Sequence, residues 1–235
     1  RVRGFLADGD RVVVSMAPSY MGLLKFKEPG QVKAALKKLG FADVRETSGG
    51  AVLVTREYAA LLEQGTMENI ITTCCPSVND LIEIYYPKLV PYLAPVVSPM
   101  IAHGRLLKKE YGAGTKVVFF GPCIAQQEDS MDLRHNDCID AVLNFQEVEN
   151  WLKQEQIEIQ ECEAEPLERI DPKVNRLYPV TNGVVNSVLA TEKQVDHYRK
   201  FYVHGIRNCI DLCESMVRAR LKQLSPILSI SEISR

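Results

Sequence analysis

The chain has 235 residues, of which 46% are hydrophobic, and this is enough to bury the core of one or two globular domains. Its 28 basic and 30 acidic residues are well mixed and give a formal net charge of -2 at pH 7. This balance argues against a surface that binds nucleic acid or anionic lipid through charge. No apolar run reaches the roughly 18 to 20 residues of a membrane span, and the first residues lack the apolar segment of a signal peptide. We therefore expect a cytoplasmic protein with no membrane span and no nucleic-acid partner.

Strand-like and helix-like segments alternate along the chain. In the first half they are a strand over 11–17, a helix over 32–39, a short apolar run over 51–54, a helix ending near Gly65, a strand over 69–73 and a helix that begins at Pro76 and ends before Pro87. In the second half they are a helix over 100–110, strands over 116–120 and 140–145, a helix over 146–152, a helix after Gly183 and an amphipathic helix over 206–221. Residues 154–177 predict a surface connection, and the final residues have no pattern that we can assign. The alternation predicts an α/β fold with a mainly parallel sheet flanked by helices on both faces.

The cysteines are the most informative residues. Their odd number, seven, and their irregular spacing argue against a secreted disulfide framework and fit reduced thiols, some of them ligands. Residues 72–76 read Thr-Thr-Cys-Cys-Pro and residues 121–123 read Gly-Pro-Cys, so each segment places a cysteine between a predicted strand and a predicted helix. A helix N-terminus presents unpaired N–H groups and a partial positive charge, which favour a thiolate or an anion.

Ligands of open α/β sheets gather at the carboxyl ends of strands, where Cys75 and Cys123 are both predicted to lie. We therefore predict that these two thiolates face one site and hold an anionic metal–sulfur cluster. The alternative is that they are small core residues, as buried free cysteines commonly are.

The other cysteines and His103 carry weaker signals. Cys209 and Cys213 lie four residues apart on one apolar helix face, which favours core packing over metal binding. His103 is expected to be a structural histidine, and Cys138 and Cys162 receive no role.

At its two cysteine motifs the chain resembles the catalytic domain of the large subunit of the iron-only (di-iron) hydrogenases. That family carries a Thr-Ser-Cys-Cys-Pro motif, a Pro-Cys-x-Ala-Lys-Lys-x-Glu motif and a third motif with Cys-x-x-x-Cys in a glycine-rich loop. Residues 72–76 match the first motif with Thr73 in place of serine, and residues 122–129 match the second with both lysines replaced. The sequence of residues 91–100, Pro-Tyr-Leu-Ala-Pro-Val-Val-Ser-Pro-Met, most resembles that of the sensory or regulatory branch of the family.

The resemblance implies two lobes of mainly parallel twisted sheet with the cluster site between them. It implies that Cys75 and Cys123 are ligands of the 4Fe-4S cubane of the H-cluster and that Cys74 passes protons to the di-iron subcluster. Residues at the remaining matched positions would line the cofactor pocket; these are Ala17, Pro18, Ser98, Pro99, Pro122 and Gln126. The implied partners are hydrogen and protons, with a ferredoxin-like electron carrier or a fused PAS or signalling domain.

Several positions depart from the family pattern. Gln126 stands where the family has a lysine that donates to an iron-bound cyanide, so the charge-assisted part of that bond is lost. Gly121 replaces a methionine, which predicts a looser pocket. Ala60 and Ala94 stand where a glutamate and a serine relay protons, which predicts slow turnover by that route; Glu63 is kept, and Asp129 is a candidate second acid.

The third cysteine motif is missing, and Cys209 and Cys213 copy its spacing only within a helix. We therefore expect residues 1–222 to form a C-terminally incomplete H-cluster domain, with residues 223–235 as an unassigned tail, and the start at Arg1 suggests a fragment of a longer protein. The sequence favours a hydrogenase-like domain that senses hydrogen or redox state, with hydrogen oxidation and proton reduction as the family chemistry. The alternatives are a non-catalytic 4Fe-4S binding subunit and a truncated fragment that holds no cluster.

Overall fold

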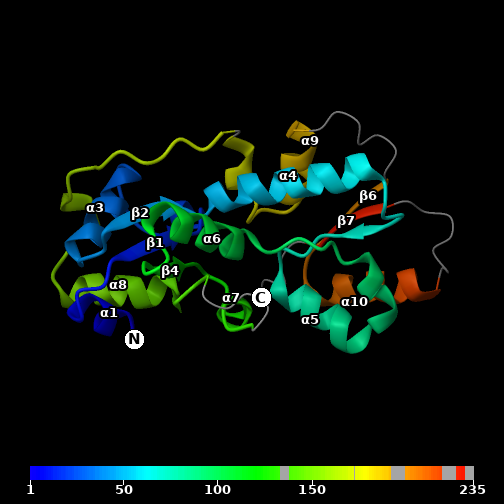
Figure 1. Cartoon of the computed structure of the whole chain (residues 1–235), viewed down its shortest axis with the longest axis horizontal. Helices are drawn as coiled ribbons and strands as arrows, with labels where there is room; N and C mark the ends of the chain where they lie inside the picture. The colour runs from blue at the N-terminus through cyan, green and yellow to red at the C-terminus, as the bar shows by residue number, and fades with distance from the viewer. Residues whose placement is uncertain (133–137, 172, 192–198, 219–225, 231–235) are drawn as a thin grey trace. The chain divides into compact units, whose positions relative to one another are not determined.

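The computed structural model describes residues 1–132, 138–171, 173–191, 199–218 and 226–230 (Figure 1). The chain divides into two compact units. Unit 1 comprises Arg1–Gly50 and Met100–Ile170, and unit 2 comprises Ala51–Pro99 and Asp171–Arg235. Each unit is built around its own parallel sheet.

The sheet of unit 1 has four strands in the order β2-β1-β4-β5. These are β1 (Val12–Met16), β2 (Asp43–Glu46), β4 (Lys116–Phe120) and β5 (Ala141–Leu143). Every neighbouring pair is parallel, with Val14 opposite Val44 on one side and opposite Val118 on the other. The predicted parallel sheet is therefore confirmed, and the central strand β1 is fully buried, as its run of valines indicates.

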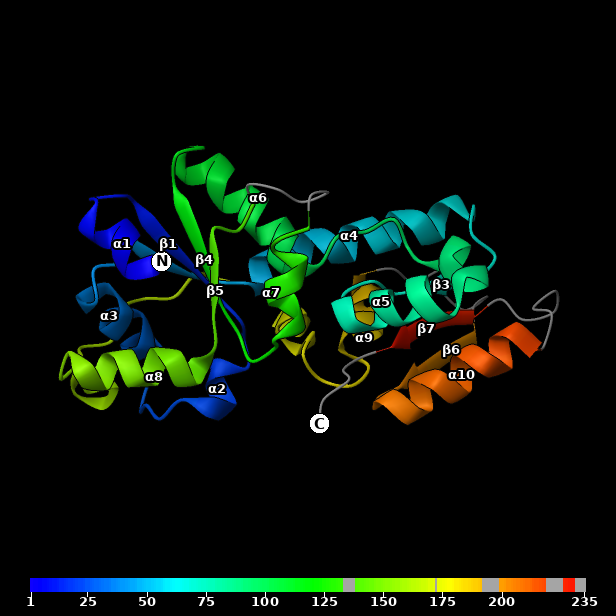
Figure 2. The ribbon, with the colours of Figure 1, turned by 90° about the horizontal axis from the view of Figure 1, so that it is seen from below.

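Helices cover both faces of this sheet. Helices α3 (Gly30–Lys38) and α8 (Phe145–Gln154) lie on one face and α6 (Pro99–Tyr111) on the other (Figure 2). Phe120 contributes to the first face, because its ring contacts Phe41, which in turn contacts Trp151 of α8. Asn144 begins α8 with a capping box, in which its side chain accepts the Glu147 N–H and the Glu147 side chain accepts the Asn144 N–H.

Short elements complete unit 1. They are α1 (Val2–Ala7), α2 (Tyr20–Leu23), α7 (Ala125–Asp129) and the 3-10 helix η3 (Ile159–Glu161). The connection around η3 is more than a surface loop. The buried Gln31 side chain accepts the N–H groups of Lys27 and Glu28 and donates to the carbonyls of Gln160 and Cys162. These bonds hold the connection against the start of α3.

Unit 2 has a three-stranded parallel sheet in the order β3-β7-β6. Its strands are β3 (Ile70–Ile71), β6 (Arg199–Val203) and β7 (Pro226–Ile230). Its helical elements are α5 (Pro76–Tyr85), η1 (Pro87–Tyr92), η4 (Lys173–Leu177), α9 (Gly183–Thr191), α10 (Ile206–Arg218) and most of α4 (Ser48–Gln64). The middle strand, β7, comes from the terminal residues for which the sequence suggested no pattern.

The main predicted elements are confirmed, and the differences have physical causes. The apolar run 51–54 lies inside helix α4, because a short apolar run does not distinguish a strand from a buried helix. Strand β2 was not predicted because it carries charges, which tertiary ion pairs compensate: Asp43 with Lys33 at 2.8 Å, and Arg45 with Glu110 at 2.8 Å and with Glu168 at 2.5 Å. Strand β5 is shorter than predicted, and α8 begins at Phe145.

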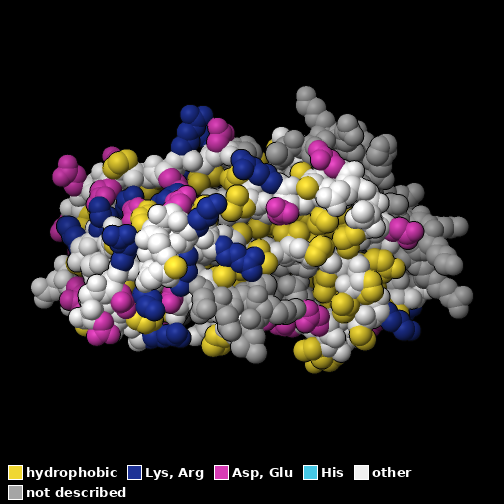
Figure 3. Space-filling view, in the orientation of Figure 1, with side chains coloured by type: hydrophobic (Ala, Val, Ile, Leu, Met, Phe, Trp, Pro, Cys, Tyr) yellow, Lys and Arg dark blue, Asp and Glu magenta, His cyan; other side chains and the backbone are white. Residues whose placement is uncertain are grey.

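The visible surface agrees with the balanced composition. In Figure 3, basic and acidic side chains are interspersed over unit 1, and no single-sign field is seen on this face. Hydrophobic side chains gather over α5 and the segment that follows it, where Ile84 and Tyr85 are exposed (Figure 3). Within the described ranges, no helix combines the length and the hydropathy that a membrane crossing requires.

Candidate functional site

The Thr-Thr-Cys-Cys-Pro segment connects strand β3 to helix α5, as predicted. Cys75 is the N-cap residue of α5 with an extended backbone, and Pro76 occupies the first helical turn, where its missing N–H is not needed. The Cys75 carbonyl accepts the N–H groups of Val78 and Asn79 at 3.1 and 3.2 Å. The half-buried Cys75 thiol therefore stands at the positive end of a ten-residue helix.

Cys74 is also half-buried and lies beside a hydroxyl group. Its Sγ is 3.9 Å from the hydroxyl of Tyr58, which comes from helix α4. Burial raises the pKa of Cys74 to about 12. The side chain is therefore a thiol at neutral pH and retains a proton that it can donate.

A hydroxyl network holds this turn in place. The Thr73 N–H donates to the Tyr58 hydroxyl at 2.8 Å, and the Thr73 hydroxyl donates to the Val96 carbonyl at 2.6 Å. The Asn79 amide donates to the Thr73 carbonyl at 3.1 Å. These bonds hold the cysteine turn against the segment around Val96. The predicted pocket residues Ser98 and Pro99 follow this segment, and Ser98 is buried.

The Gly-Pro-Cys segment follows strand β4 in unit 1. Cys123 is half-buried and precedes α7, a helix of only five residues whose N-cap is Ile124. The Ala17 N–H donates to the Phe120 carbonyl at 2.8 Å and joins the carboxyl ends of β1 and β4. The predicted residues of this unit, Ala17, Pro18, Pro122, Cys123 and Gln126, thus follow two neighbouring strands.

The space above Gly121 is filled rather than open. A Cβ atom placed on Gly121 would lie 2.3 and 2.6 Å from Cε1 and Cζ of Phe119, and 3.4 Å from Oε1 of Gln126. Phe119 and residue 121 share one face of the strand, because side chains alternate along it. The buried Phe119 ring therefore takes up the volume that a side chain at position 121 would occupy, and the expectation of a looser cofactor pocket stays a prediction.

Cys209 and Cys213 belong to a hydrophobic core cluster of unit 2. Both are fully buried in α10 beside Ile82 and Leu89, and Cys75 packs against the same cluster. Burial, followed by the influence of Cys75, raises the pKa of Cys209 to about 11. Core packing therefore accounts for these two cysteines, as the helical pattern indicated.

A 4Fe-4S cluster takes four thiolate ligands. Among the residues that the structure describes, no group of three or more His, Cys, Asp or Glu side chains is arranged to hold a metal ion. Cys75 and Cys123 supply suitable soft donors at strand ends, one in each unit. The described residues therefore do not complete the donor set.

Sequence reasoning missed the hydroxyl groups around Cys74. Besides Tyr58, the buried Thr55 hydroxyl donates to Oδ1 of Asn175 at 2.7 Å and lies 2.8 Å from the Tyr178 hydroxyl. Burial raises the pKa of Tyr178 well above its usual value, and the nearby Cys74 adds to that shift. Thr55 and Tyr58 are three residues apart on α4, so their helical spacing was the available signal.

His103 is a structural residue, as expected. Its Nδ1 lies 2.7 Å from the Ser15 hydroxyl, which is 2.8 Å from the Thr47 hydroxyl. All three side chains are buried, and burial together with the charge of Arg45 lowers the pKa of His103 to about 3.

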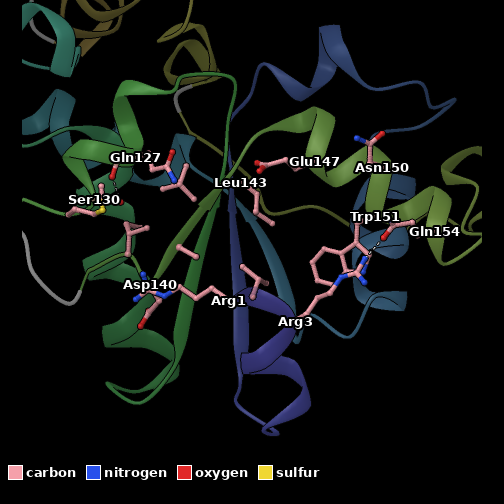
Figure 4. A pocket seen from close by; sticks show the side chains of 15 residues that line it. Arg1, Arg3, Gln127, Ser130, Asp140, Leu143, Glu147, Asn150, Trp151 and Gln154 are labelled. Carbon is pink, nitrogen blue, oxygen red and sulfur yellow. Dashed lines mark hydrogen bonds between the residues drawn. The ribbon is translucent and has the colours of Figure 1, made fainter.

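A separate cavity of about 800 Å³ opens in unit 1 along strand β5 (Figure 4). Trp151 lines it, with the Arg3 guanidinium 5.0 Å from the ring centroid and 2.5 Å from the Gln154 side chain. Asp140 and Glu147 also line it, and its lining includes none of the cysteines. The cavity is therefore distinct from the cysteine turns.

Comparison with known proteins identifies the family. The model of the family described as "Iron only hydrogenase large subunit, C-terminal domain" matches residues 10–227. Iron hydrogenase 1 of Clostridium pasteurianum is 27% identical over 220 residues, which cover 82% of this chain and 38% of that protein. The periplasmic Fe hydrogenase large subunit of Nitratidesulfovibrio vulgaris is 29% identical over 181 residues, which cover 68% of this chain and 43% of that protein.

The chain thus spans about two fifths of the length of these curated relatives. Among solved structures, an apo variant of the FeFe-hydrogenase HydA1 from Chlamydomonas reinhardtii has a TM-score of 0.75 and 19% identity, covering 98% of this chain and 81% of that one. This likeness shows that the fold is that of the FeFe-hydrogenases. Because the family model matches all but the first nine and the last eight residues, the chain belongs to the iron-only hydrogenase large-subunit family, C-terminal domain.

Proposed function

We propose that this chain is part of an H-cluster domain that senses hydrogen or redox state. The observation that carries the proposal is the Cys74–Cys75 turn, with one thiol at the start of α5 and the other beside Tyr58. Cys75 and Cys123 are the proposed cubane ligands, and Cys74 is the proposed proton-side thiol. When bound, the cluster would supply the redox chemistry of hydrogen oxidation and proton reduction.

The surroundings of Cys74 support sensing over fast turnover. In the described residues the side chain that hydrogen-bonds to Cys74 is a phenol, and Ala94 contributes only its backbone to the turn. Glu63, the acid kept from the family relay, is exposed. A phenol with a pKa raised by burial exchanges protons with solvent less readily than a carboxylate does.

The pocket residues Ala17, Pro18, Ser98, Pro99, Pro122 and Gln126 are proposed to line the cofactor site. A ferredoxin-like electron carrier or a fused signalling domain is the proposed partner, and the cytoplasmic location stays a prediction. The expected domain limits, residues 1–222, also stay a prediction.

Infrared spectroscopy tests the cofactor. The full-length parent protein, matured anaerobically, should show bands from iron-bound CO and cyanide. Cys75→Ser and Cys123→Ser should remove them, whereas Cys162→Ser, at a buried cysteine outside both motifs, should keep them. A matured parent without these bands would contradict the H-cluster proposal.

A second candidate is a domain that holds a 4Fe-4S cluster without the di-iron unit. It is favoured by the replacement of both relay positions with Ala60 and Ala94, since a methyl group passes no proton. Such a domain would give a 4Fe-4S electron paramagnetic signal without infrared bands and without hydrogen uptake. Unchanged iron content in Cys75→Ser would contradict both candidates and favour a fragment that binds no cluster.

A further inference from the structure

Tyr58 is a buried phenol whose hydroxyl lies between Thr73 and Cys74. Its oxygen accepts the Thr73 N–H at 2.8 Å, lies 3.2 Å from Thr73 Oγ1 and lies 3.9 Å from Cys74 Sγ. The side chain is 2% exposed, so protein groups rather than bulk water must satisfy its hydroxyl.

The available protons determine the direction of these bonds. Thr73 has one hydroxyl proton. It is donated to the Val96 carbonyl, which is 2.6 Å away, because the Ala94 carbonyl is farther, at 3.2 Å. Thr73 Oγ1 is therefore left as an acceptor, and the Tyr58 hydroxyl proton is directed to it. The Tyr58 oxygen has two lone pairs. One accepts the Thr73 N–H, and the other remains for the Cys74 S–H.

We propose that Tyr58 is a positioning residue that directs the Cys74 S–H bond toward its own hydroxyl oxygen. The bonds then run in one sense, from Cys74 through Tyr58 and the Thr73 hydroxyl to the Val96 carbonyl. The relevance of this orientation to hydrogen chemistry rests on the proposed function, whereas the orientation itself is a property of the chain without a cluster.

The neighbouring Tyr178 serves as a natural comparison. It is also buried, and its hydroxyl is 2.8 Å from the Thr55 hydroxyl, which in turn donates to Asn175. The two phenols have separate hydrogen-bond partners in the described residues, and the hydroxyl 3.9 Å from Cys74 Sγ is that of Tyr58. Loss of either hydroxyl removes one buried oxygen, but only the loss at position 58 is expected to free the Cys74 S–H.

The test is the S–H stretching band of the 235-residue chain prepared without a cluster. Cys74→Ser assigns the Cys74 band by difference. Because a hydrogen bond lowers the stretching frequency of its donor, Tyr58→Phe should move that band to higher frequency, and Tyr178→Phe should leave it in place. A purely structural role for Tyr58 would not single out the Cys74 band.

An unmoved band in folded Tyr58→Phe, or an equal shift in Tyr178→Phe, overturns the proposal. If Tyr58→Phe does not fold, fluorotyrosine incorporated in place of tyrosine provides the second measurement. The fluorinated phenol is a weaker acceptor, so the S–H stretching frequency of Cys74 should again increase. An unchanged frequency overturns the proposal. Neither measurement needs the cluster, so this proposal and the proposed function can fail separately.

Discussion

Gly121→Ala tests how tightly the turn before Cys123 is packed. The added Cβ would lie 2.3 Å from Cε1 of Phe119, far inside van der Waals contact. The Phe119 ring has little room to move, because it is 1% exposed on a strand paired with β1 on one side and β5 on the other. The backbone at Gly121 has no positive φ, so backbone strain adds nothing to the steric overlap.

The expected loss of stability follows from two opposing effects. Overpacking a filled core costs about 1 to 3 kcal/mol, and the short contact favours the upper half of that range. Replacing glycine also lowers the entropy of the unfolded chain, which offsets about 0.4 to 1 kcal/mol. A net loss of about 1 to 2.5 kcal/mol remains. For a chain of this size it lowers Tm by about 2 to 10 °C.

Urea unfolding and thermal melting measure this loss. Gly114→Ala is the matched control, because an added Cβ there meets nothing within 4 Å and its backbone has no positive φ. It should leave stability unchanged or slightly raised. Phe119→Leu replaces the ring with a smaller side chain. In that background Gly121→Ala should lower the free energy of unfolding by less than it does in the native chain. A neutral Gly121→Ala in the native background would refute the argument that Phe119 fills this space.

Three further predictions concern the buried polar groups. First, the pKa of His103 is lowered to about 3 from 6.5, so the unfolded state binds more protons between these values and stability falls as pH falls below 6.5. From pH 7 to pH 5 the native chain should lose about 2 kcal/mol more than His103→Gln in urea unfolding, and equal losses would contradict the burial of a neutral imidazole. Second, Thr55→Val should cost about 1 to 3 kcal/mol, because the buried Tyr178 hydroxyl and Asn175 each lose a partner, and the exposed Thr66→Val should stay within about 0.5 kcal/mol. Equal urea midpoints for these two variants would argue against the network. Third, Gln31→Ala should speed proteolytic cleavage within residues 159–168, since it removes two side-chain bonds to the connection, whereas Gln146→Ala, at an exposed position of α8, should not. Mass spectrometry of the fragments reads the cleavage sites, and identical patterns would show that the connection is held by other contacts.

The sequence alone was sufficient where a local pattern dominates. The valine runs of β1 and β4 are buried parallel strands, and Pro76 starts α5 as its fixed φ favours. The two cysteine turns follow the same logic, because a strand that ends at a Cys-Pro or Pro-Cys segment leaves the thiol near a helix start. These short-range signals also carried the family resemblance.

Contacts between distant residues decided the rest. Charged β2 became a strand because Lys33, Glu110 and Glu168 compensate its side chains, and none of these partners is its neighbour in sequence. The terminal strand β7 pairs with β3 on one side and with β6 on the other. No local pattern in its residues predicts this pairing.

The same distinction holds at the candidate site. Cys75 and Cys123 are predicted as ligands from spacing and residue type, because both are expected at the end of a strand, whereas the role predicted for Cys74 comes from the family resemblance. Tyr58, which contacts Cys74 from another helix, and Phe119, which fills the space over Gly121, could not be selected in this way. Their roles depend on the direction in which a buried side chain points once α4 and β4 are packed. Sequence thus determined which thiols are present at the strand ends, and tertiary packing decided what surrounds them.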